Sequence, residues 1–167
     1  MTNNNAKKDT ATYIEDLSLV VERTFDAPRE IVWEAWSQPE HVALWWGYQE
    51  MKLHVCEIDL RVGGSYRFVQ LTPDGAELPF KGVYREVVEP ELMVYTQIFD
   101  VEPYSIHEAV VTDTFVEHPG GKTKLTSKTE FPTSEALQGA LASGAEAGAA
   151  ASIERFAEHL KSLIADN

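Results

Sequence analysis

Residues 134–165, SEALQGALASGAEAGAAASIERFAEHLKSLIA, decide the fold, because they predict one long helix at the end of a chain that is mostly strand-like. A tryptophan-rich helical stretch, residues 28–46, and a long run of alternating sequence precede them. A curved antiparallel sheet has a concave face that must be covered, and one terminal helix laid across it can leave a cavity. This order of elements predicts a protein that holds a small molecule rather than one that transfers hydride or handles phosphate.

The two halves of the predicted terminal helix differ in the size of their side chains. The second half carries a helical apolar stripe that should clamp the sheet, made of Ile153, Phe156, Ala157, Leu160, Leu163 and Ile164. The first half has no large side chain after Leu141, and each of its glycines costs a helix about 1 kcal/mol relative to alanine. Small residues there predict either close backbone packing or empty space.

Seven alternating segments predict the strands of a mainly antiparallel meander, which makes the fold class α+β. Short breaks such as Gly63-Gly64 and Pro73-Asp74-Gly75 favour hairpins between them. Two short helices are expected after the first strand, between Pro28 and Gly47. The irregular link 100–107 is the candidate for a mobile rim. The segments are 17–25, 51–60, 65–72, 80–88, 92–99, 108–117 and 122–131.

The composition predicts a single cytoplasmic domain, residues 15–167, after a flexible N-terminal leader, residues 1–14. The longest apolar runs are far shorter than the ~20 residues that a membrane span needs. The net charge of −13 argues against nucleic acid as a partner. Cys56, the only cysteine, excludes an internal disulfide and is expected to be an inert core thiol rather than a reactive one. A homodimer stays open.

Aromatic residues of the strand segments, with Trp46, are the candidate wall of the cavity. In a cavity fold the core and the ligand wall are the same layer of side chains, and small-ligand pockets are mainly apolar. Within the terminal helix, Ala145 and Ala149 are the positions where a bulky side chain would fill the space. The candidate ligand-binding residues are therefore Trp46, Phe68, Phe80, Tyr84, Tyr95, Phe99, Ala145 and Ala149.

Polar groups offer fewer candidates. Glu57 and Arg61, with His54 nearby, would orient a ligand or move a proton if they faced the cavity, but alternating charges more simply predict a solvated strand face. Arg23 falls on the apolar phase of the first strand, where it either snorkels to water or lines the cavity. The histidines are scattered without metal-ligand spacing, and no dinucleotide fingerprint is present. We therefore expect no metal and no cofactor.

Four ordered blocks resemble the family of homologues of the activator of the heat-shock protein 90 ATPase. They are FDAPREIVWEAWSQPEHVALWWG (25–47), CEIDLRVGGSYRF (56–68), GVYREVVEPELMVYT (82–96) and SIERFAEHL (152–160). The resemblance implies a helix-grip fold of the START and polyketide-cyclase-like superfamily, in which a seven-stranded antiparallel sheet wraps around a long C-terminal helix. Many relatives carry a bulky Met or Trp in the first half of that helix, where this chain has Ala145 and Ala149.

What the resemblance implies about activity leaves three hypotheses in order of preference, because fold alone does not fix function. The first is a non-enzymatic binding protein for a small hydrophobic molecule, such as a lipid, polyketide or aromatic metabolite. The second is an enzyme of cyclase or hydrolase type that uses Glu57, His54 or Arg61 around the same cavity. The third is a cochaperone-like interaction module. The family has no universal catalytic residue, so no active site is carried over.

Overall fold

The computed structural model describes residues 9–47 and 52–165 of the chain. Eight strands form one antiparallel sheet in the order β1-β2-β8-β7-β6-β5-β4-β3. The elements are β1 (Thr10–Glu15), β2 (Ser18–Phe25), α2 (Arg29–Ser37), α3 (Pro39–Trp45), β3 (Val55–Ile58), β4 (Ser65–Leu71), β5 (Glu77–Val88), β6 (Leu92–Phe99), the 3-10 helix η1 (Tyr104–Ile106), β7 (Ala109–His118), β8 (Lys122–Glu130), α4 (Ser134–Ala142) and α5 (Ala145–Ala165).

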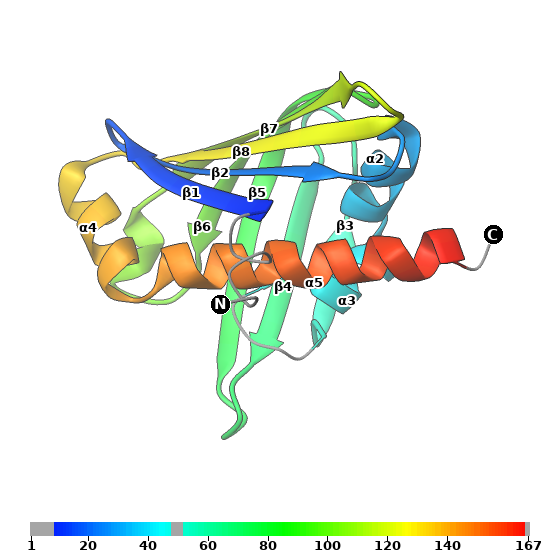
Figure 1. Ribbon diagram of the computed structural model, residues 1–167. Coiled ribbons are helices and arrows are strands. Elements are labelled where there is room, and N and C mark those ends of the chain that lie inside the picture. Colours follow the sequence, from blue (N-terminus) through cyan, green and yellow to red (C-terminus); the bar gives the residue numbers. More distant parts are fainter. Residues whose placement is uncertain (1–8, 48–51, 166–167) are drawn as a thin grey trace, which may run out of the picture.

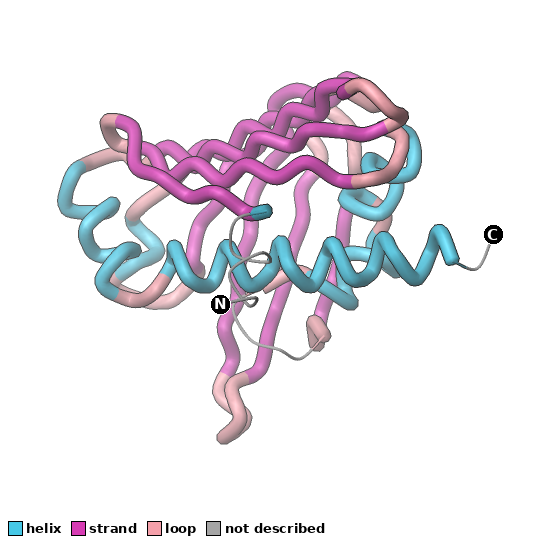
Figure 2. The backbone as a smooth tube through the Cα atoms, viewed as in Figure 1, coloured by secondary structure: helices cyan, strands magenta, loops and turns pink. Residues whose placement is uncertain are grey.

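The sheet curls around α5, which runs across its concave side (Figure 1). From β3 to β8 each strand pairs with the next one along the chain, as expected for a meander. The helices α2 and α3 carry the chain from β2 to β3 at the opposite edge of the sheet, and they lie beside the second half of α5 (Figure 2). The α+β class and the helix-grip arrangement predicted from the sequence are therefore confirmed.

The prediction of seven strands was wrong by one. Thr10–Glu15 forms the additional strand β1, which pairs with β2 through a two-residue turn in which Asp16 has φ 54°. Its sequence, TATYIE, combines β-branched and aromatic residues, and that composition favours a strand although its side chains are mostly exposed. The predicted flexible leader is thus a strand from Thr10 onward, and residues 1–8 lie outside the described residues.

The predicted single terminal helix is two helices, α4 and α5, separated at Ser143 and Gly144. Gly144 has φ +88°, a left-handed conformation that glycine adopts without steric cost and that commonly ends helices. The hydroxyl of Ser143 donates to the carbonyls of Gly139 and Ala140, which satisfies two acceptors at the end of α4. The break turns the small-residue segment away from the axis of α5.

An aromatic cluster joins the second half of α5 to the helices and the sheet. Phe156 is fully buried, and its ring lies 5.0 Å from Phe25, 5.1 Å from Trp36 and 4.8 Å from Trp45, in edge-to-face geometries that aromatic pairs favour. Most of the predicted stripe is buried with it, but Ile164 is 40 % exposed. The second half of α5 therefore forms the clamp on the core.

Polar contacts fix the position of α5 as well. Arg155 donates from Nε to the carbonyl of Trp45 at 3.1 Å and from its guanidinium to the carbonyl of Gly47, so it caps the end of α3. Arg23 forms an ion pair with Glu154 of α5 and donates to Thr10 of β1 at 2.7 Å. Neither interpretation of Arg23 from the sequence was right, because its charge is paired under α5.

A histidine pair links α3 to α5 and makes stability depend on pH. Nδ1 of His41 lies 2.9 Å from Nε2 of His159, and Nε2 of His41 lies 3.8 Å from the carboxylate of Glu34. Burial, and then His41, lower the pKa of His159 below its ordinary value of 6.5. The unfolded chain therefore takes up this proton at higher pH than the folded chain, so this contribution to stability is present above pH 6.5 and lost as pH falls below it.

We expect His159→Gln to weaken the fall in stability between about pH 8 and pH 5.5, measured by urea unfolding of wild type and variant. The exposed His54 provides the matched control, since His54→Gln removes a histidine without touching the pair. Identical pH dependence in wild type and His159→Gln would contradict the assignment.

Candidate functional site

A cavity of about 790 Å³ lies between the sheet and the first half of α5. Its size falls in the range of roughly 300–1,000 Å³ typical of small-molecule sites. The strands β2, β5, β6, β7 and β8 form one wall, and α4, α5, η1 and the end of α3 form the other. Its lining is mainly apolar, with few polar groups.

Six of the eight residues predicted to bind a ligand line this cavity. They are Trp46, Phe80, Tyr95, Phe99, Ala145 and Ala149. Their neighbours Gly139, Ala140 and Gly148 line it as well, so the small residues of α4 and α5 leave space rather than pack closely on the sheet. Whether these side chains bind a ligand stays a prediction.

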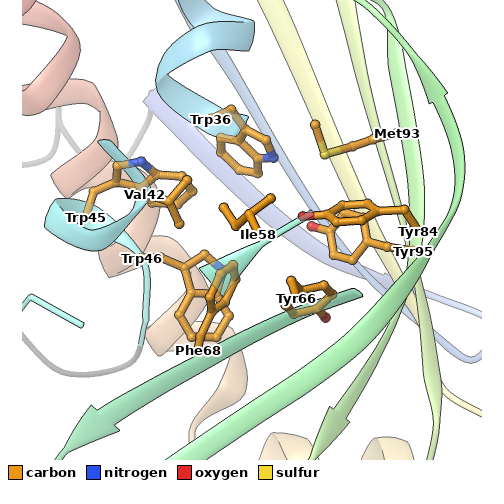
Figure 3. A pocket seen from close by; sticks show the side chains of 10 residues that line it. All are labelled: Trp36, Val42, Trp45, Trp46, Ile58, Tyr66, Phe68, Tyr84, Met93 and Tyr95. Atoms are coloured by element: carbon orange, nitrogen blue, oxygen red, sulfur yellow. The ribbon is translucent and has the colours of Figure 1, made fainter. Parts of the chain in front are cut away.

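Phe68 and Tyr84 line a different, small void of about 20 Å³ (Figure 3). In that view the tryptophans of the helical side face tyrosines of the sheet across the void. Trp46 separates the two spaces, because its ring packs 4.8 Å from Phe68 and 5.1 Å from Phe80. The small void is large enough for about one water molecule, so Phe68 and Tyr84 are core residues behind the cavity wall.

The predicted polar groups lie elsewhere. His54, Glu57 and Arg61 are exposed and none of them lines the cavity. Arg61 forms an ion pair with Asp59 at 3.0 Å, as expected of a solvated strand face with charge pairs. The second hypothesis therefore loses the residues on which it was based.

Cys56 has the properties of the inert thiol that was expected. It is half-buried, and its Sγ lies 3.5 Å from the carbonyl of Pro39. Burial, and then the nearby Glu40 and Glu57, raise the pKa of the thiol to about 12. A thiol protonated at neutral pH is a poor nucleophile.

Sequence reasoning missed Asp113, a fully buried carboxyl group behind the cavity wall. It accepts hydrogen bonds from Trp36 Nε1 at 2.9 Å, Tyr95 Oη at 2.7 Å and Ser127 Oγ at 2.6 Å. The signal was present in AVVTDTF, residues 109–115, where an aspartate occupies the apolar phase of a strand. Burial raises the pKa of Asp113, although its hydrogen bonds oppose that shift.

The rim of the cavity carries further polar groups and two exposed apolar side chains. Gln97, His107 and Glu135 line it, and in the described part of the chain no hydrogen bond or ion pair joins the side chains of His107 and Glu135. Tyr104 and Ile106 of η1 are 51 % and 75 % exposed. The irregular link predicted as a rim therefore does border the cavity.

Neither a metal cluster nor a membrane-spanning helix occurs within residues 9–47 and 52–165. No group of three or more His, Cys, Asp or Glu side chains is arranged there to hold a metal ion. No helix there is long and apolar enough to cross a membrane.

A curled antiparallel sheet around a terminal helix, with a cavity between them, defines a protein of the helix-grip class. The family model "Activator of Hsp90 ATPase homolog 1-like protein" matches residues 26–161, and the chain belongs to this family. No curated protein matches the chain.

Solved bacterial structures share the fold over nearly their whole length. A crystal structure from Mycobacterium smegmatis has 26% identity and a TM-score of 0.78, and the match covers 90% of this chain and 94% of that one. A solution structure from Staphylococcus epidermidis has 25% identity and a TM-score of 0.77, with 91% and 94% covered. A crystal structure from Rhodobacter sphaeroides, at 21% identity, has a TM-score of 0.82, with 92% and 99% covered, and shows the fold alone.

Proposed function

We propose that this protein binds a small hydrophobic molecule in the cavity between the sheet and the first half of α5. The observation that supports this most directly is a space of about 790 Å³ whose walls are mainly aromatic and aliphatic. An apolar space of this size lacks dispersion contacts until a ligand occupies it. A lipid, polyketide or aromatic metabolite has the required chemistry.

An enzyme of cyclase or hydrolase type is the runner-up, and an interaction module comes third. His107 and Glu135 are a histidine and a carboxylate at the same cavity, which is the combination that an acid–base enzyme requires. Glu135 is exposed in the first turn of α4, however, and no contact between the two side chains is present in the described residues. Cytoplasmic location and homodimer formation remain predictions from the sequence.

Two measurements test binding directly. Native mass spectrometry of the purified protein should show a copurified hydrophobe that is released on denaturation. Titration with the neutral fluorescent probe N-phenyl-1-naphthylamine should saturate at one site, with the negative heat-capacity change that accompanies burial of apolar surface. A ligand at about 100 times its Kd should add about 2.7 kcal/mol of stability. The absence of both a copurified molecule and saturable probe binding would refute the proposal.

A further inference from the structure

Asp113 organises the polar part of the cavity wall. On the neighbouring strand β8, Ser127 is its direct cross-strand partner, and Tyr95 reaches it from β6 on the other side. Trp36, Tyr95 and Ser127 all line the cavity, while Asp113 itself is completely buried behind them. Three cavity-lining side chains are thus held by one carboxyl group that does not line the cavity.

These hydrogen bonds determine what the wall offers to a ligand. A hydroxyl has one proton to donate and two lone pairs that accept, whereas an indole N–H only donates. Tyr95 and Ser127 direct their protons to Asp113, so their oxygens retain only accepting capacity, and the Trp36 donor is already used. Burial, and then Asp113, raise the pKa of Tyr95 well above its ordinary value, so the phenol keeps the proton that it donates.

The charge of Asp113 favours the same kind of ligand. Within the described residues Asp113 makes no ion pair, and its three hydrogen-bond partners are uncharged. A buried carboxylate without a cation is costly, and a donor brought to the adjacent oxygens, or a positive charge, offsets part of that cost. A ligand carboxylate would instead meet lone pairs and a negative charge.

We propose that the cavity selects an apolar molecule that carries one hydrogen-bond donor, an alcohol or a protonated amine, whose donor is accepted by Tyr95 and Ser127. The inference rests on the proposed function and adds the chemical class of the ligand. It also predicts discrimination against a carboxylate or an ether built on the same apolar chain.

The test is displacement of N-phenyl-1-naphthylamine by four molecules with matched chains: decan-1-ol, decylamine, decyl methyl ether and decanoate. The alcohol and the amine are expected to displace the probe at concentrations at least about tenfold lower than the ether and decanoate, the range of one hydrogen bond. Equal displacement by alcohol and amine assigns the preference to hydrogen bonding. Displacement by the amine alone assigns it to the charge of Asp113, and both results support a donor.

Asp113→Asn provides the sharpest variant. The side-chain amide can keep its oxygen on Trp36 and Tyr95 while its nitrogen donates to Ser127, whose own proton then turns toward the cavity. The preference for the alcohol over the ether should fall to within about threefold, because Ser127 can now donate to the ligand. Thr114→Val is the matched control: it removes a neighbouring β7 hydroxyl, bonded to the carbonyl of Thr126, that does not line the cavity.

Ser127→Ala and Tyr95→Phe replace Asp113→Asn if that variant does not fold, as judged by circular dichroism. Each removes one acceptor and should lower the preference for the alcohol without abolishing probe binding. Equal displacement by all four molecules, or tightest displacement by decanoate, would overturn the inference and leave the proposed function standing. A failure of the probe itself to bind wild type would remove both.

Discussion

Replacing Phe156 with alanine is expected to lower the free energy of unfolding by about 3–5 kcal/mol. Phe156 is completely buried, and its ring makes edge-to-face contacts with Phe25, Trp36 and Trp45. Alanine leaves a cavity at the point where α5, the sheet and the helices α2 and α3 meet, and the neighbouring rings cannot all move in to fill it. Such a loss is a large fraction of the roughly 5–15 kcal/mol that stabilises a domain.

Urea unfolding followed by circular dichroism measures this effect. Ile164→Ala is the matched control on the same helix, because Ile164 is 40 % exposed and its truncation should change stability by no more than about 0.5 kcal/mol. The denaturant midpoint of Phe156→Ala should fall while the slope stays unchanged. A loss below about 1 kcal/mol would show that this contact is not the main clamp.

The sequence predicted the fold well where hydrophobic periodicity is strong. The meander from β3 to β8 and the clamping half of α5 follow from alternation and from a helical stripe, because burial on one face imposes those patterns. The strand β1 was missed since its side chains are largely exposed, so its sequence carries little alternation. The break at Gly144 was missed because glycine within an Ala-rich segment is compatible both with a helix and with its end.

The candidate site was predictable only in its apolar part. Aromatic residues on the inward phase of the strands had to face the helix, and most of those proposed do line the cavity. Phe68 and Tyr84 could not be separated from them by sequence, because the position of Trp46 decides which rings reach the cavity. Asp113 was overlooked because only the structure shows that donors from three distant segments meet at its carboxyl group.

Replacing Ala149 with tryptophan is expected to abolish binding of N-phenyl-1-naphthylamine while leaving the fold intact or slightly stabilised. Ala149 is a half-buried residue of α5 that lines the cavity, one helical turn before the buried Ile153 and one after Ala145. An indole at this position enters the space that a ligand would occupy. Filling an empty apolar space in an unstrained rotamer restores dispersion contacts, so the thermal midpoint should not fall.

Ala151→Trp is the control, because Ala151 is exposed on the same helix and does not line the cavity. That variant adds the same side chain and should bind the probe like wild type. If Ala149 instead packed directly on the sheet, its replacement would overpack the core and cost about 1–3 kcal/mol. Titration of the probe against both variants, with melting temperatures alongside, separates these outcomes. Loss of binding without loss of stability requires that the indole occupies the space the ligand needs, whereas unchanged binding would place the ligand elsewhere in the protein.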